Sequence, residues 1–461
     1  MNLAINLSKS YTKIGYLLNG NYMDIVSARE VPTAFTYSPT SDNLIFGNKN
    51  YDYNLIRLLY ENPSFKLGSF SLTEIFFQFF LFLDRKYLAP NGLDFTSVSL
   101  SVPSYFNLKA RQIIYSAINK VYPSAKIYLI AEPAAALIGY KLINENSPLK
   151  GDILIIDVAE KSWDFSFATF SPNINTLVIE KQLSCELNQA KVEKLTSYFN
   201  NQLITSAKNL GLYDYTGWKL DYVLLAGEEL PDGEIYNSLT NLLAPLPIIK
   251  GAKASLNTVQ GLAVWPKMID NLKVKIIYPF NFYIQTYVQE TNAIEYIPFD
   301  TNNLELDITK SYKICTLPLY SPYNLANKQA LALFKIYEIA LDHNKNELDI
   351  KNLKGQEIRL STEIPPDYVE PTLDVILDFA TNTLSLDYTA TIYEEKSPII
   401  PETNLEHNLD WLILSKFTNN LALQDDLANF LEGINFDSSI PLTDELALLK
   451  YKLLTLLNYI A

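Results

Sequence analysis

The sequence predicts an α/β fold made of two similar halves, followed by an all-β region and a short helical C-terminal segment. Two distant segments, 3–18 and 153–170, share one pattern in which a polar turn separates two apolar strands. Between them, buried strands alternate with helices, which is typical of a sheet covered by helices. We therefore expect an internal repeat of two half-domains, each beginning with a three-strand meander.

The first half begins with strands at 3–7, 13–18 and 22–26. Asn19-Gly20 separates the last two, and both residues tolerate the positive φ that a two-residue hairpin turn requires. A very apolar run at 75–83 is far too short to span a bilayer and predicts a buried helix.

The most informative stretch lies between residues 100 and 166. It reads S-V-P-S-Y-F-N-L-K-A-R-Q at 101–112, I-A-E-P-A-A-A-L-I-G-Y at 130–140 and G-D-I-L-I-I-D-V-A-E-K-S-W-D-F-S at 151–166. The pattern predicts a helix from near Lys109, and Pro133 suits the first turn of a second helix because its missing N–H would have no partner there. Glu132 and Asp157 then lie at strand ends, where open α/β sheets place their ligands.

These runs resemble the heat-shock 70 kDa (DnaK-type) chaperones, whose motifs read V-P-A-Y-F-N-x-x-Q-R-Q, N-E-P-T-A-A-A-L-A-Y-G and F-D-L-G-G-G-T-F-D-V-S. The resemblance implies an actin-like ATPase domain of the duplicated ribonuclease-H-like type at 1–266, with nucleotide between its halves. It further implies a linker at 267–277, a β-sandwich peptide-binding-like domain at 278–393 and a truncated helical lid at 394–461.

The resemblance also assigns candidate site residues. It implies vestigial catalytic roles for Glu132, Asp157 and Asp164, and the family's lysine near the attacking water falls close to Ile56 or Arg57. The candidates for nucleotide contacts are Lys9, Ser10, Ser162 and Gly227. A structural interpretation stays open, because the three carboxylates can instead cap turns and the helix that Pro133 opens.

The chain departs from the family where phosphates would bind. Residues 159–161 are Ala, Glu and Lys in place of three glycines, although glycine is what lets backbone N–H groups approach a phosphate closely. Asn6 replaces a carboxylate, Glu228 adds negative charge, and the connection from 180 to 187 is too short for the family's adenosine-clamping subdomain. We expect either no cofactor or weak ATP or ADP binding with magnesium, and an inefficient ATPase.

Composition narrows the classes of partner. The 461 residues carry a net charge of −14, which opposes nucleic acid as a partner. Cys185 and Cys315 form no disulfide framework, and His343 and His407 lie far apart, so we expect a reducing compartment, the cytoplasm, and no metal site. No membrane-spanning segment is expected.

Three functions remain open. The first is a divergent chaperone-like protein that binds a polypeptide client or protein partner without a working ATP cycle, with a peptide groove at Ile284, Thr286, Tyr287 and Leu331. The second is an ATP-dependent chaperone in which Lys9 and Lys161 replace the glycine cradle. The third is an actin-fold scaffold in a dedicated assembly. The groove residues have an alternative interpretation as the core of a β-sandwich.

Overall fold

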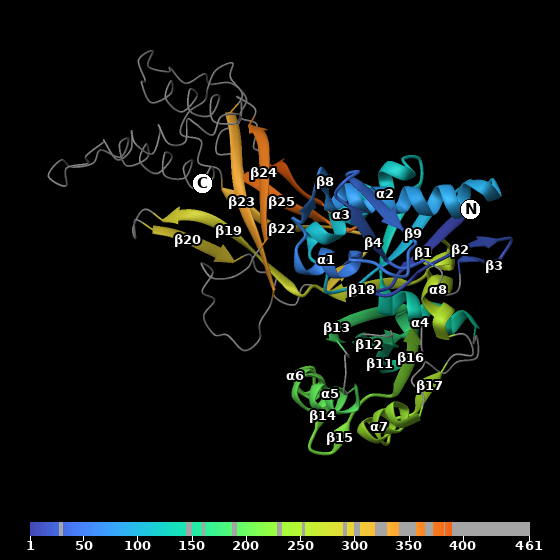
Figure 1. The fold of residues 1–461 in the computed structure, drawn as a ribbon. Helices are drawn as coiled ribbons and strands as arrows, with labels where there is room; N and C mark the ends of the chain where they lie inside the picture. The colour runs from blue at the N-terminus through green and yellow to red at the C-terminus, as the bar shows by residue number, and fades with distance from the viewer. Residues whose placement is uncertain are drawn as a thin grey trace, which may run out of the picture. The chain divides into compact units, whose positions relative to one another are not determined.

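The structure is a computed structural model that describes residues 1–26, 31–143, 150–158, 162–186, 191–227, 233–250, 254–288, 293–298, 305–318, 330–340, 356–364, 372–381 and 383–389. It divides into two compact units (Figure 1). The first unit comprises Met1–Pro279, Asn303–Lys310 and Phe379–Thr383, and the other described residues form the second. Within the first unit we call residues 1–143 the first lobe and 150–277 the second lobe.

The first lobe is built on a five-stranded sheet of order β10-β9-β1-β2-β3. β1 is parallel to β9, which is parallel to β10, whereas β1, β2 and β3 form the expected antiparallel meander. Asn19 and Gly20 have φ of 52° and 88°, so the predicted hairpin turn is confirmed. The strands are β1 (Asn2–Leu7), β2 (Thr12–Leu18), β3 (Asn21–Val26), β9 (Ser97–Val102) and β10 (Lys126–Ala131).

Helices α2 (Leu72–Leu83) and α3 (Leu108–Val121) pack together and contribute to the core of this lobe. α2 contains the predicted apolar run, and its Ile75, Phe76 and Phe79 are fully buried. The side chains of Ser71 and Asn107 cap α2 and α3 by accepting from backbone N–H groups of the first turn. The smaller elements are β4 (Ala34–Ser38), β5 (Asn43–Phe46), β6 (Tyr53–Asn54), α1 (Leu55–Glu61), β7 (Lys66–Leu67), β8 (Phe70–Ser71), η1 (Asp84–Leu88) and η2 (Ala89–Asn91).

The second lobe repeats the strand order of the first. Its seven-stranded sheet has the order β17-β16-β11-β12-β13-β18-β21, in which β11, β12 and β13 form a meander and β16 and β17 continue in parallel from β11. The predicted internal repeat therefore extends to five strands of each sheet. The strands are β11 (Gly151–Val158), β12 (Ser162–Ser171), β13 (Thr176–Glu186), β16 (Tyr222–Gly227), β17 (Ile248–Lys250), β18 (Lys273–Ile277) and β21 (Glu305–Asp307).

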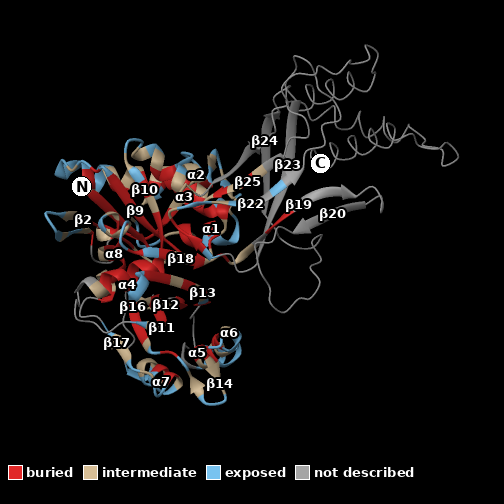
Figure 2. Ribbon diagram, turned by 180° about the vertical axis from the view of Figure 1, so that it is seen from behind, coloured by how far each residue is buried: buried red, intermediate tan, exposed pale blue. Residues whose placement is uncertain are grey.

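Helices α4 (Glu132–Ile143) and α8 (Ala254–Met268) lie between the two sheets and pack against each other (Figure 1). They cross at Gly139 and Gly261, where a Cβ on either glycine would overlap a backbone carbonyl oxygen of the other helix. Buried residues concentrate in these helices and in both sheets (Figure 2). The remaining elements of the second lobe are η3 (Pro172–Ile174), α5 (Lys191–Tyr198), η4 (Phe199–Leu203), α6 (Ile204–Asn209), β14 (Tyr213–Asp214), β15 (Gly217–Trp218) and α7 (Gly233–Leu243).

The segment predicted as a linker differs from that expectation. α8 continues past Pro266 to Met268, and Lys273–Ile277 form β18, which pairs in parallel with β13. Val274 and Ile276 are fully buried, and Lys275 pairs with Glu305 at 3.0 Å. The lysines at alternate positions therefore lie on the outer face of β18. The first unit extends beyond the predicted boundary at 266 to Pro279.

The second unit contains two sheets. One has the order β20-β19-β23-β24, in which neighbouring strands are antiparallel. The other has the order β22-β25-β26, with β22 antiparallel to β25. Their strands are β19 (Phe280–Val288), β20 (Ala293–Pro298), β22 (Ser311–Pro318), β23 (Ala330–Ala340), β24 (Gln356–Ile364), β25 (Thr372–Asp378) and β26 (Thr383–Thr389). The predicted lid at 394–461, both histidines and residues 159–161 and 228 lie outside the described residues. None of the described helices has the length and apolar character needed to cross a bilayer.

Candidate functional site

The strands that flank the two turns singled out by the sequence occupy corresponding places in the two sheets. Lys9 and Ser10 lie in the turn between β1 and β2, and Ser162 opens β12 after the equivalent turn of the second sheet. Asp157 near the end of β11 is the register partner of Asp164 on β12. The repeated meander therefore brings Lys9 and Ser10 of the first lobe and Ser162 of the second lobe to one cleft.

Lys9 joins the two lobes across this cleft. Its Nζ lies 2.7 Å from Oδ1 of Asp164 and donates to Oγ of Ser184 at 2.5 Å. The Asp164 side chain is only 7% exposed and that of Lys9 is 24% exposed, so the pair is shielded from water. Nδ2 of Asn54 donates to the backbone oxygen of Lys9 at 2.6 Å and holds the turn in place. Lys9, which the resemblance assigns to nucleotide binding, is thus paired with a carboxylate of the protein itself.

A second polar contact crosses between the lobes. Oε1 of Gln182 on β13 accepts hydrogen bonds from the backbone N and from Oγ of Ser104, each at 2.6 Å. Both residues are buried. Ser104 lies in the loop that follows β9, within the predicted S-V-P-S-Y-F-N motif. This contact and the Lys9 pair both connect the lobes through residues of the protein itself.

The predicted carboxylates gather around Tyr105. Burial raises the pKa of this phenol well above its ordinary value, and the negative charges of Asp164, Glu132 and Asp157 raise the pKa further. Tyr105 also lies beneath Lys9, whose Nζ is 5.6 Å from the centre of the ring, and its ring meets that of Tyr60 edge-on at 5.3 Å. The hydroxyl consequently stays protonated and presents a hydrogen-bond donor among acidic groups.

The position that the resemblance assigns to a magnesium-ordering carboxylate has a structural role here. Oδ1 of Asn6 accepts from Oγ of Ser101 at 2.7 Å, and the same Oγ accepts from the backbone N of Leu7 at 3.0 Å. Asn6 is buried. Its hydrogen bond with Ser101, together with the one between Ser101 and Leu7, ties β1 to β9. Within the part of the chain that the structure describes, no group of three or more His, Cys, Asp or Glu side chains is placed to hold a metal ion.

The cleft between the lobes has a volume of about 740 Å³. Lys9, Ser10 and Ser162 line it, as do Ile56 and Arg57, near which the resemblance placed the family's lysine. Apart from Leu183, the rest of its walls is polar or aromatic. The further lining residues are Tyr51, Asp52, Asn54, Tyr60, Glu61, Tyr105, Gln182, Leu183, Ser184, Tyr198 and Gln202. Cavities of 300–1,000 Å³ are typical of small-molecule sites. The cleft could therefore hold an organic ligand, with tyrosine rings for stacking and amides for hydrogen bonds.

Gly227 is not one of the residues that line the cleft. It ends β16 with φ of +103°, and a Cβ there would overlap Asp157 and the backbone of Val158. The glycine is needed for the close approach of β16 to β11, which is a packing role.

The predicted peptide-groove residues belong to the second unit. Ile284 is paired with Ile297 on β20 and Ile336 on β23, while Leu331 is paired with Glu363 on β24. Thr286 and Tyr287 lie further along β19, paired with β20. All four positions are therefore in one four-stranded sheet.

Several cleft residues were missed from the sequence. Gln182 and Ser184 are alternate residues of β13, and this alternation of polar side chains was the available signal. Tyr105 belongs to the S-V-P-S-Y-F-N motif, but nothing in that motif distinguishes it as a site residue.

Comparison with models of known protein families gives no match, and no curated protein matches the sequence.

Proposed function

We propose that the chain is a divergent DnaK-type, chaperone-like protein that binds a polypeptide client or protein partner without an efficient ATPase cycle. The first unit would be an actin-like domain, and the repetition of one strand order in its two sheets supports that assignment. The antiparallel sheets of the second unit support a β-sandwich that carries the peptide groove.

The Lys9–Asp164 ion pair is the main observation that supports the proposed loss of the ATPase cycle. A triphosphate entering the cleft would compete with Asp164 for the Lys9 ammonium. Separating the two groups leaves a buried carboxylate without its counter-charge, at a cost of about 3–5 kcal/mol for a fully buried pair and less for this partly exposed one. The negative charges of Asp164, Glu132 and Asp157, which already raise the pKa of Tyr105, would in addition oppose the approach of phosphates.

The lack of a base clamp supports the same proposal. Only residues 187–190 separate β13 from α5, which leaves no room for an α+β subdomain at that place. A nucleotide would therefore rely on the cleft walls alone.

A second candidate is an ATP-dependent chaperone with a remodelled phosphate site. The volume of the cleft, about 740 Å³, and its tyrosine rings favour it. Thermal unfolding with and without Mg-ATP separates the two, since a ligand that binds the folded state raises the melting temperature. Our proposal expects no rise.

Binding of a fluorescent, reduced and alkylated polypeptide that cannot refold tests the proposed activity directly. We expect saturable binding that Mg-ATP does not reverse, and at least about tenfold weaker binding for Ile284→Asp and Leu331→Asp, equal to about 1.4 kcal/mol. Tyr215→Ala, at a site 99% exposed in the first unit, is the control. Circular dichroism establishes that the variants are folded. Absence of binding by the unaltered chain would disprove the proposal.

A further inference from the structure

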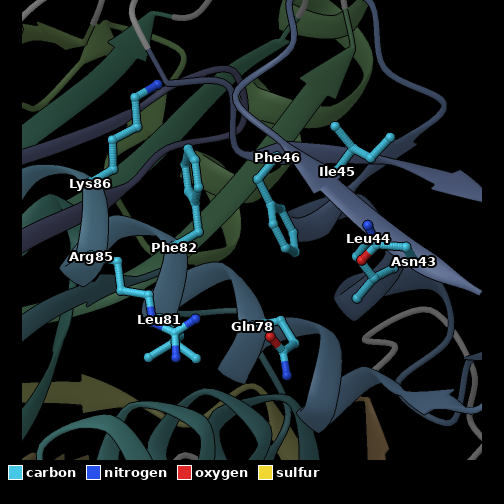
Figure 3. Close-up of a pocket in the computed structure, with 9 residues that line it drawn as sticks. All are labelled: Asn43, Leu44, Ile45, Phe46, Gln78, Leu81, Phe82, Arg85 and Lys86. Atoms are coloured by element: carbon cyan, nitrogen blue, oxygen red, sulfur yellow. The ribbon is translucent and has the colours of Figure 1, made fainter.

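A second surface feature of the first lobe is a groove between strand β5 and helix α2, which we call the β5–α2 groove (Figure 3). Its volume is about 550 Å³. β5 forms one side, and Gln78, Leu81, Phe82, Arg85 and Lys86 form the other. None of these residues lines the cleft between the lobes.

The floor of the groove is apolar. Phe46 and Phe82 approach each other with ring centres 5.8 Å apart, and both point into the groove (Figure 3). Ile45, which precedes Phe46 on β5 and points to the other side of the strand, is 39% exposed (Figure 3). Covering aromatic and aliphatic surface of this kind with a partner lowers the free energy of the complex.

The strand beside this floor has an open edge. β5 is the outer strand of the three-stranded sheet β5-β4-β6, and among the described strands it pairs with β4 alone. Outside that ladder, none of the backbone hydrogen bonds between described residues involves Asn43–Phe46. An unpaired strand edge offers alternating N–H and C=O groups to an extended peptide.

The charge of the groove is opposite to that of the whole protein. Arg85 and Lys86 are exposed, and no carboxylate lines the groove, although the chain carries a net charge of −14. Neither forms an ion pair with any described carboxylate. Lys86 Nζ instead lies 5.3 Å from the centre of the Phe82 ring, at the border of the apolar floor. Distant negative charges are screened beyond about 8 Å at physiological salt, so a ligand in the groove meets these two cations first.

We propose that the β5–α2 groove binds an extended acidic and apolar polypeptide segment of another protein, which adds to β5 as a further strand. The strand edge selects an extended backbone, the Phe46 and Phe82 rings select apolar side chains, and Arg85 with Lys86 selects glutamate or aspartate. This site is independent of the peptide groove proposed in the second unit and of any nucleotide.

The probe is a short fluorescent peptide with valine and isoleucine at alternate positions and glutamates near both ends. We expect saturable binding below about 1 mM by anisotropy. One control peptide carries lysines in place of the glutamates, and another is N-methylated at alternate backbone amides, which blocks strand pairing. Both controls should bind at least about tenfold more weakly.

Charge reversal on the protein gives the matching test. Arg85→Glu with Lys86→Glu should weaken binding by about tenfold. Lys109→Glu with Lys120→Glu on α3 makes the same change in net charge at exposed sites of the same lobe and should have little effect. Amide hydrogen exchange at Asn43–Phe46 should slow when the peptide is bound. Absence of binding, equal affinity for the N-methylated peptide, or equal effects of the two double variants would overturn the proposal.

Discussion

Lys9 reaches from the first lobe to two strands of the second, where it contacts Asp164 on β12 and Ser184 on β13. The resemblance to the family's motifs marked both Lys9 and Asp164 as candidate site residues. It could not indicate that they meet, since that contact depends on how the two lobes pack. Ser184 lies beyond those motifs, and only the register of β12 with β13 brings it to the site.

Replacing Lys9 by methionine keeps most of the side-chain volume and removes the charge. Asp164 then stays buried without its cation, so we expect the free energy of unfolding to fall by about 1–3 kcal/mol. Urea denaturation measures the change. Lys49→Met, at an exposed residue of the same lobe, is the control, and an equal effect of both substitutions would contradict the importance of the pair.

A double-mutant cycle isolates the interaction itself. Asp164→Asn should cost less in the Lys9→Met background than alone, because the partner charge is already gone. A coupling energy near zero would show that Lys9 and Asp164 contribute separately.

The helix pair α4–α8 illustrates what patterns can and cannot predict about elements. Pro133 and the alanine run that follows it predict α4. The crossing of the two helices was not predictable, because it depends on Gly139 meeting the backbone of Asn257, more than a hundred residues away along the chain. β18 was missed for a different reason: its lysines were interpreted as interruptions of a linker, whereas Val274 and Ile276 between them are buried.

Gly139→Ala gives a test in which two effects have opposite signs. Helix propensity alone would stabilise α4 by about 0.5–1 kcal/mol. The new methyl group would, however, overlap the carbonyl oxygen of Asn257, and overpacking of this kind costs about 1–3 kcal/mol. We expect a net loss by thermal or urea denaturation, and Ser116→Ala on the exposed face of α3 is the control. A gain in stability would mean that the helices cross less closely.

At the scale of the whole chain, the repetition of one strand order was the most predictable property. Both lobes begin with an antiparallel meander, and local polar turns indicate such meanders directly. The addition of β18 and β21 to the second sheet was not predictable, because β21 comes from Glu305–Asp307, after two strands of the second unit. The cleft follows from the repeat, but its closure by Lys9 and Gln182 depends on side-chain contacts between lobes.

Isothermal titration of the full chain with Mg-ATP at physiological magnesium tests the central claim most directly. Asn6 is engaged by Ser101, Lys9 is neutralised by Asp164, and no base clamp fits between β13 and α5. Each of these missing nucleotide contacts costs on the order of 1–3 kcal/mol of binding free energy. Because about 1.4 kcal/mol corresponds to a tenfold change in the dissociation constant, together they would weaken a micromolar site to about millimolar or weaker. The account predicts no saturable heat below about 1 mM. A micromolar dissociation constant that is abolished by Asp157→Ala would contradict it and establish the cleft as a working nucleotide site.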